Sequence, residues 1–131
     1  MSFRAGSLTA ALLSAAGVAS AAAAGDSSFY GHWARGDGAA RVRIAPCGGA
    51  ACVTNTWIRP GTPDEKSGDR LTMDVKPAGA GKWSGTAFDP QRNLRYSMTI
   101  NVANDHMTSD GCILGGLVCK HMSWTRLGGP R

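Results

Sequence analysis

The feature that most constrains this chain is a set of short runs in which apolar and polar residues alternate. The cleanest run is LRYSMTINV, residues 94–102, where every second residue from Leu94 to Val102 is apolar and the residues between are polar. Successive side chains of a β-strand point to opposite faces, so this pattern predicts a strand with one buried and one solvated face. Weaker runs of the same kind occur at residues 40–44, 70–76, 81–87 and 119–127, and no helical stripe follows residue 24.

Turn-forming residues separate these runs at regular intervals. They divide residues 25–131 into about eight strands joined by short turns at 36–38, 48–49, 60–63, 79–81, 89–90, 104–105 and 115–116. One apolar face per strand favours antiparallel neighbours, and closing the sheet removes its exposed edges. The sequence therefore predicts an all-β fold, a small antiparallel up-and-down β-barrel in a single domain. The longest connection, residues 59–69, is polar, and we expect it to be mobile.

The alternation also predicts which side chains point into the barrel. Val53 and Trp57 share one face of the run CVTNTWI, and Gly85 and Ala87 follow Trp83 on the inward side of their strand. The small residues at 85 and 87 leave room, either for a ligand or for larger side chains opposite. Aromatic and methionine side chains suit apolar ligands. The candidate ligand-lining set is Trp57, Met73, Trp83, Tyr96, Met98, Met122 and Trp124.

The first 24 residues are predicted to be a secretory signal peptide. They combine an early positive charge, Arg4, with an uncharged alanine-rich stretch and small residues at its end. Two cleavage sites fit, after Ala24 or after Ala21, and we prefer Ala24. A membrane anchor is the weaker interpretation, because the run is short for a bilayer and alanine is only weakly apolar. Residues 25–131 then form the mature domain, in the periplasm or outside the cell.

The charge of the mature domain is mildly positive. Losing Arg4 leaves 13 basic against 9 acidic residues, a net charge of +4. The basic residues are scattered, whereas nucleic-acid-binding proteins concentrate them on one face. We therefore expect no nucleic-acid partner and no stable membrane insertion, although weak attraction to anionic lipid or envelope polymer fits the charge. The protein partner, if there is one, is not readable from the sequence.

Four cysteines, Cys47, Cys52, Cys112 and Cys119, lie in the mature domain. An even number in a small exported chain indicates disulfides, with three possible pairings. The segments CGGAAC and CILGGLVC favour local pairing across two hairpins, because glycine adopts the conformations of tight turns. Two-residue turns at their midpoints, 49–50 and 115–116, would place each pair directly opposite, the first at a closer position than the second. The alternative is a zinc site, whose usual ligand spacing these cysteines fit poorly.

Catalytic and metal-binding patterns are weak in this sequence. His32, His106 and His121 lie on separate strands or turns, and we expect His32 and His121 to face outward. Asp89 precedes Pro90, as is typical of a turn, although a barrel could also bring Asp74 near it as a pair of carboxylates. No nucleophile motif is present. We expect a protein that is not an enzyme and that has no metal or cofactor.

Two residues near the ends of the mature chain suggest how the barrel is closed. Gly31-His32-Trp33 precedes the first alternating run, and Arg126 follows Trp124 in the last. A Gly-x-Trp on the first strand with an arginine on the last is similar to the signature of lipocalin-type barrels. The resemblance implies that Arg126 lies across Trp33 as a cation–π stack and closes one end.

A second resemblance covers nearly all of the mature chain. The order GHW, ARVRIAPCGGAACV, WSGTAFDPQRNLRYSMTI and MTSDGCILGGLVCKHMSWTRL resembles small exported bacterial proteins known as domain of unknown function 2147. The resemblance implies export in Gram-negative bacteria and a lipocalin-like barrel, but no activity. The segment GTPDEKSGDRL is shorter than its counterpart in many members, so an entrance formed there would differ.

Two functional hypotheses remain. In the first, the barrel binds a small apolar ligand in the periplasm. In the second, the same inward residues fill the barrel completely, and the protein is an interaction or envelope-maintenance module. Cavity volume separates the two, because small-molecule sites usually exceed roughly 300 Å³.

Overall fold

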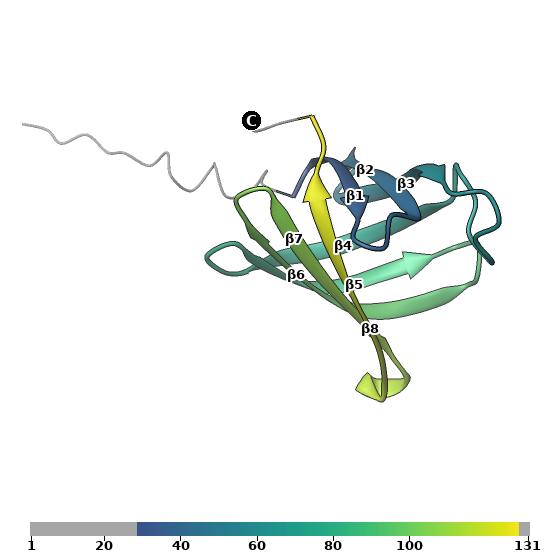
Figure 1. Cartoon of the computed structure of the whole chain (residues 1–131). Helices are drawn as coiled ribbons and strands as arrows, with labels where there is room; N and C mark the ends of the chain where they lie inside the picture. Colours follow the sequence, from purple (N-terminus) through teal and green to yellow (C-terminus); the bar gives the residue numbers. More distant parts are fainter. Residues whose placement is uncertain (1–28, 129–131) are drawn as a thin grey trace, which may run out of the picture.

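The computed structural model describes residues 29–128 as one closed barrel of eight antiparallel strands in sequential order (Figure 1). The predicted signal peptide and both cleavage sites lie outside the described residues. The strands are β1 (Gly31–Arg35), β2 (Ala40–Cys47), β3 (Ala50–Ile58), β4 (Arg70–Gly79), β5 (Lys82–Asp89), β6 (Leu94–Ala103), β7 (His106–Ile113) and β8 (Val118–Arg126). A short 3₁₀ turn, η1 (Leu114–Gly116), joins β7 to β8. The predicted all-β up-and-down barrel is confirmed.

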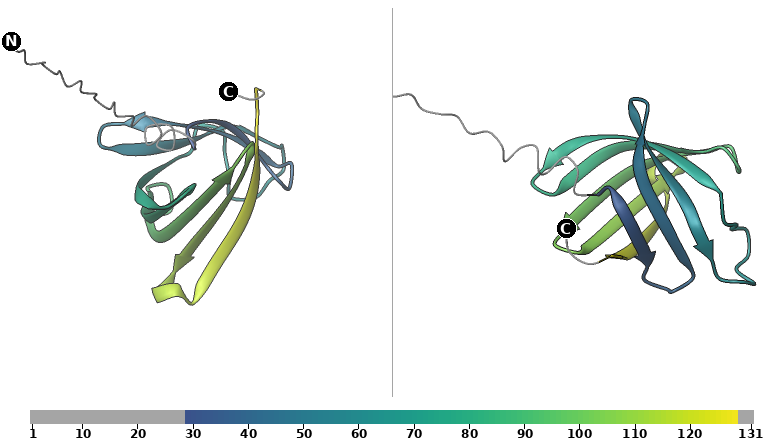
Figure 2. Two further views of the ribbon diagram at one scale, coloured as in Figure 1. Left: turned by 90° about the vertical axis from the view of Figure 1, so that its left-hand side faces the viewer. Right: turned by 90° about the horizontal axis from the view of Figure 1, so that it is seen from above.

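The sheet closes where the first strand pairs with the last. Trp33 lies opposite Arg126 and Arg35 lies opposite Trp124 across this β1–β8 seam. In an up-and-down barrel alternate connections lie at opposite ends. One end, here called the closed end, contains the β2–β3, β4–β5 and β6–β7 hairpins with the start of β1 and the end of β8. The other, the open end, contains the four remaining connections (Figure 2).

The core follows the predicted alternation on most strands. The buried side chains include Trp33, Val42, Ile44, Met73, Trp83, Ala87, Ile100 and Met107. Gly85, however, does not leave space for a ligand. A Cβ atom at this position would run into the backbone carbonyl of Asp74 on the neighbouring strand. Glycine is therefore required by the close approach of β4 and β5, and not by the contents of the barrel.

The prediction that Trp57 points inward is wrong, and a β-bulge is the reason. The register between β2 and β3 shifts so that Arg41 pairs with Trp57 while the next residue, Val42, pairs with Asn55. The extra residue, Thr56, reverses the alternation beyond it. Asn55 therefore faces the interior, and Trp57 lies outside with 38% of its surface exposed, beneath the guanidinium of Arg41 at 5.2 Å.

Both cysteine pairs form local disulfides, in agreement with the predicted pairing, but the hairpins differ from those expected. In the β2–β3 hairpin the turn is Gly48–Gly49, so Cys47 lies opposite Ala50 and its disulfide to Cys52 is diagonal. In the β7–β8 hairpin Cys112 lies directly opposite Cys119, with a Cα–Cα distance of 4.0 Å. The pair therefore occupies the close, non-hydrogen-bonded position of an antiparallel ladder, whereas a two-residue turn would place it at the wider, hydrogen-bonded position. The difference arises because η1 lengthens the loop to four residues.

The long connection between β3 and β4 is held at several points, contrary to the expectation of a mobile loop. The last residues of this loop form two hydrogen bonds with the backbone of Asn55 on β3. The Asn55 N–H donates to the carbonyl of Asp69 at 2.9 Å, and the N–H of Gly68 donates to the carbonyl of Asn55 at 2.8 Å. In its middle, Glu65 forms an ion pair with Arg35 of β1. The loop thereby becomes a fixed part of the open end.

Candidate functional site

The closed end is sealed by Trp33 and Arg126. Trp33 is fully buried, and its Nε1 donates a hydrogen bond to the carbonyl of Phe29 at 3.0 Å. The Arg126 guanidinium carbon lies 4.3 Å from the centre of the Trp33 ring, and its Nη1 donates to the carbonyl of Tyr30 at 3.0 Å. This is the geometry of a cation–π stack. We call these residues, with Phe29, the floor.

Gly31 of the Gly-His-Trp segment allows this arrangement. It has a φ of 126°, which side-chain-bearing residues rarely adopt, and a Cβ there would come within 3.1 Å of Arg126 Nη1. Phe29 meets Trp83 edge-on at a centroid distance of 4.9 Å. The floor therefore continues into the core, and Trp83 belongs to it.

Above the floor lies an interior cavity of about 240 Å³ that reaches the open end. Its deep walls are apolar, and its upper walls carry polar and charged side chains from the β3–β4 and β5–β6 connections. The deep lining includes Val42, Ile44, Met73, Ile100 and Met107, and the middle lining includes Leu71, Tyr96, Met98, Met122 and Trp124.

Five of the seven candidate lining residues surround this cavity: Met73, Tyr96, Met98, Met122 and Trp124. Trp83 is buried beneath it against Phe29, and Trp57 lies outside the barrel. Sequence reasoning missed Met107, a buried residue of β7. Its strand reads HMTSDGCI, whose inward residues after Met107 are serine and glycine, so the apolar alternation that marks the other strands is absent there.

Asp89 anchors the β5–β6 turn at the rim of the cavity. Its carboxylate accepts from the backbone N–H of Gln91 at 2.9 Å and from Arg92 Nη1 at 2.7 Å. Burial alone would raise the pKa of Asp89, but the hydrogen bonds from Arg92 and Gln91 outweigh it and lower the pKa below its ordinary value. Asp89 is therefore charged and forms the turn expected of an Asp-Pro pair.

A second charge cluster joins strand β1 to the β1–β2 and β3–β4 connections around the buried Arg35. Arg35 Nη1 and Nη2 donate to the two carboxylate oxygens of Glu65 at 2.7 and 2.9 Å, and Nε donates to Asp37 at 3.0 Å. The hydrogen bonds that Arg35 donates lower the pKa of both Glu65 and Asp37, and the bond that Glu65 accepts raises the pKa of Arg35. All three groups are ionised, and the β3–β4 loop is thereby joined to β1.

Tyr96 is a half-buried side chain on the cavity wall below this rim. Burial raises the pKa of its hydroxyl, and the negative charge of Asp89 raises it further. The hydroxyl is therefore neutral at physiological pH, and it offers a hydrogen-bond donor near the mouth.

A second hollow, of about 400 Å³, adjoins the mouth beneath the β3–β4 loop. It shares Glu65, Lys120 and Met122 with the interior cavity, and its other walls include Arg35 and Arg59. The two hollows together give the open end a polar, charged entrance above an apolar interior.

The structure shows where the residues of the catalytic and metal-binding alternatives lie. Asp74 is exposed on the outer face of β4 beside Lys76, whereas Asp89 is buried inside, so the two carboxylates do not face each other. His32, His106 and His121 are all exposed. Among residues 29–128 no group of three or more histidine, cysteine, aspartate or glutamate side chains could hold a metal ion.

Taken together, the closed eight-stranded barrel, the floor stack and the interior cavity define a lipocalin-like barrel. Comparison with protein families agrees with the resemblance that the sequence motifs indicate. Residues 31–126 match the family described as "Uncharacterized protein conserved in bacteria (DUF2147)", and the chain belongs to that family. No curated protein and no solved structure matches the chain.

The disulfides indicate the kind of cellular compartment in which the protein folds. Two disulfides in a chain of 131 residues are typical of a protein that folds outside the reducing cytosol. Within residues 29–128 there is no helix long and apolar enough to cross a membrane.

Proposed function

We propose that this protein is an exported, periplasmic binding protein that holds a small apolar ligand inside its barrel. The observation that carries the proposal is the 240 Å³ cavity inside the barrel, which has an apolar lining and reaches the open end. A barrel filled by its own side chains would have no such space. The proposal includes no catalytic step, no cofactor and no metal.

The composition of the cavity indicates the chemistry of the ligand. The deep part is lined by aliphatic and methionine side chains such as Met73, Ile100 and Met107, which favour an apolar body. Polar partners are available at the mouth, namely the Tyr96 hydroxyl and the charged side chains of the rim. A ligand with an apolar body and a small polar end satisfies both regions.

The volume sets the size of the ligand. An apolar cavity of roughly 150 Å³ holds benzene, so about 25 Å³ serve each non-hydrogen atom. On that scale this cavity of about 240 Å³ takes on the order of ten non-hydrogen atoms. A longer ligand would extend through the mouth into the charged entrance.

The periplasm is supported by two features of the chain. The first 24 residues have the composition of a secretory signal peptide, and both cysteine pairs are at disulfide distance. An oxidising compartment reached by export satisfies both.

A second candidate function, an interaction or envelope-maintenance module without ligand, is favoured by one observation. The cavity of about 240 Å³ is smaller than the roughly 300–1,000 Å³ of ordinary small-molecule sites. In this case the cavity is a packing defect between core side chains, and the outer surface of the barrel carries the function.

Native mass spectrometry of the mature protein, purified gently from the periplasm, separates the two functions. A bound mass that leaves on denaturation supports the binding protein and allows the ligand to be identified. In addition, naphthalene, an apolar probe of about ten non-hydrogen atoms, is titrated into ligand-stripped protein. A bare polypeptide in the spectrum together with no binding of naphthalene would reject the binding function.

A further inference from the structure

The β7–β8 hairpin ends in an exposed apolar tip. The segment between Cys112 and Cys119 reads ILGGLV and contains no polar side chain. Leu114 is 68% exposed, Leu117 85% and Val118 51%. We call residues 113–118 the apolar tip. A connection in water normally carries polar residues, so these three side chains call for an explanation beyond the fold.

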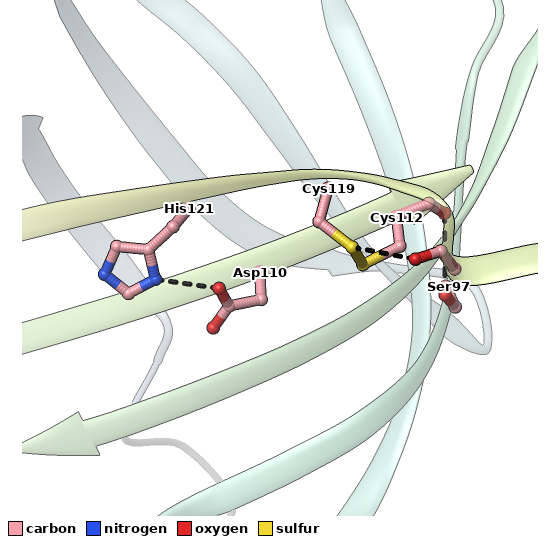
Figure 3. Close-up of a disulfide and its surroundings, with 6 residues drawn as sticks. Ser97, Asp110, Cys112, Cys119 and His121 are labelled. Atoms are coloured by element: carbon pink, nitrogen blue, oxygen red, sulfur yellow. Dashed lines mark hydrogen bonds and ion pairs between the residues drawn. A yellow bond between two sulfur atoms is a disulfide. The ribbon is translucent and has the colours of Figure 1, made fainter. Parts of the chain in front are cut away.

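The hairpin carries this tip away from the rest of the barrel. Figures 1 and 2 show β7 and β8 extending beyond the neighbouring strands, with η1 at their far end. The disulfide between Cys112 and Cys119 joins the two strands directly below the tip (Figure 3). Leu114, Gly115 and Gly116 all have positive φ, between 55° and 95°, which turns the chain sharply at the end. The tip is thus a convex projection held at its base.

Two basic side chains lie near the base of the tip, one of which, Lys120, also interacts with Glu65 across the mouth. Lys120 follows the tip by two residues on β8, and Arg95 lies on β6 next to the base of the hairpin, where Ser97 pairs with Cys112. The nearby carboxylate, Asp110, contacts the ring of His121 at 2.7 Å (Figure 3). Residues 25–131 carry a formal net charge of +4, from 13 basic and 9 acidic residues. A partner of this surface is therefore expected to be negatively charged.

We propose that the apolar tip docks the protein on an anionic lipid bilayer by inserting its leucine side chains into the interfacial region. Apolar side chains next to basic ones bind such membranes through buried apolar area and attraction to acidic headgroups. A lipid surface accepts a convex projection without a matching groove. A second copy of the chain fits less well, because two tips meeting end to end would bury far less than the roughly 1,200 Å² of specific protein interfaces.

Docking by the tip places the mouth of the barrel toward the membrane. The tip and the other three connections of the mouth lie at the same end. From Val118 the inward face of β8 continues through Lys120 and Met122 to Trp124, and the last three of these line the cavity. The inference goes beyond ligand binding and does not depend on it, since the tip docks whether or not the barrel holds a ligand.

The test is sedimentation of the mature protein with vesicles of equal parts phosphatidylcholine and phosphatidylglycerol, compared with phosphatidylcholine alone. The wild type is expected to bind the anionic vesicles more tightly than the neutral ones. Leu114→Ser with Leu117→Ser should weaken binding roughly 10- to 100-fold, because two partly inserted leucines are lost. Both side chains are exposed, so circular dichroism and the melting temperature should remain those of the wild type.

A matched control is Leu127→Ser at the closed end, where the leucine is 37% exposed. It should bind as the wild type does, whereas Leu117→Ser alone should not. No vesicle binding by the wild type, or equal losses for the two single variants, would overturn the proposal. A dimer detected by sedimentation velocity and abolished by Leu117→Ser would also overturn it, because the tip would then contact a second copy.

Discussion

The two ends of this barrel are built from different interactions. At the closed end a fully buried tryptophan lies against the guanidinium of an arginine, next to an edge-on pair of aromatic rings. At the open end ion pairs surround a cavity: Arg35 with Glu65 joins β1 to the β3–β4 loop, and Arg92 with Asp89 holds the β5–β6 turn. Buried aromatic packing therefore dominates at the closed end, where Arg126 Nε also lies 3.5 Å from Asp105 Oδ1. At the open end, charge pairs hold the turns and loops around a cavity.

The two disulfide hairpins repeat this difference. Cys47–Cys52 encloses only glycine and alanine at the closed end, whereas Cys112–Cys119 encloses four large aliphatic residues at the open end. One disulfide therefore closes a turn of small residues, whereas the other supports an exposed apolar tip. Changes at the closed end should affect stability alone, whereas changes at the open end can also affect binding.

The largest effect is expected from Trp33→Ala. Removing this fully buried side chain should lower the free energy of unfolding by roughly 3–5 kcal/mol, because it leaves a cavity under Arg126. Urea denaturation measures the change. Trp57→Ala is the matched control on the outer surface and should cost less than about 1 kcal/mol. An unchanged melting temperature for Trp33→Ala would contradict the role of the floor.

Removal of each disulfide in turn compares the two hairpins directly. Replacing either pair by alanine should lower stability by roughly 2–2.5 kcal/mol, since both close short loops. Only the Cys112→Ala, Cys119→Ala protein should also bind anionic vesicles more weakly, because its tip is less constrained. If loss of the Cys47–Cys52 bond weakened vesicle binding equally, the proposed division between the ends would be wrong.

Glu65→Gln tests the charge pair of the open end. It should lower stability at neutral pH by about 1–2 kcal/mol, because Arg35 loses a charged partner in a partly exposed site. Folding lowers the pKa of Glu65 from its ordinary value of 4.5. The contribution of the pair is therefore complete above that pH and lost as the pH falls below it. Denaturation curves at a series of acidic pH values should show a shallower decline for Glu65→Gln than for the wild type.

Asp64→Asn is the control for that experiment. It removes an exposed carboxylate of the same loop that makes no ion pair within residues 29–128. Its stability should follow the pH as the wild type does. Parallel curves for all three proteins would show that the Arg35–Glu65 pair does not stabilise the open end.

The smallest effect on stability is expected from Gly111→Ala. Its Cβ would lie 3.2 Å from the sulfur of Met98, a flexible side chain on the cavity wall. Stability should change by less than about 1 kcal/mol, while naphthalene should bind about tenfold more weakly because a methyl group occupies the cavity. Gly49→Ala, at the closed end and with no atom within 4 Å of the added carbon, should leave both quantities unchanged. Equal naphthalene affinity in both variants would mean that the probe binds elsewhere.

Much of the fold was readable from the sequence because burial follows the strand period. The inward-facing residues from Val42 to Ile100 can be predicted from the alternation of apolar and polar residues alone. The exception, Trp57, shows the limit of that reasoning. A single extra residue at Thr56 reverses every side chain beyond it, and bulges depend on how two strands meet and not on one strand alone.

The candidate site was less predictable than the fold. The cavity walls follow from strand parity, but the rim depends on contacts between distant segments. Arg35 and Glu65 are 30 positions apart, and nothing in a polar loop marks which carboxylate will reach a buried arginine. The loops of the two cysteine hairpins also differ from the two-residue turns expected at their midpoints, because glycine pairs permit several loop geometries.

The β1–β8 seam has a consequence for the order in which the molecule can assemble. Arg126 contacts Tyr30 across 96 positions of sequence, so the floor joins nearly the two extremes of the domain. Such distant contacts slow folding, since a long loop must close before they form. A chain that emerges from its N-terminus first therefore holds Trp33 without its arginine until almost the whole domain has emerged, and the barrel closes only as its last strand arrives.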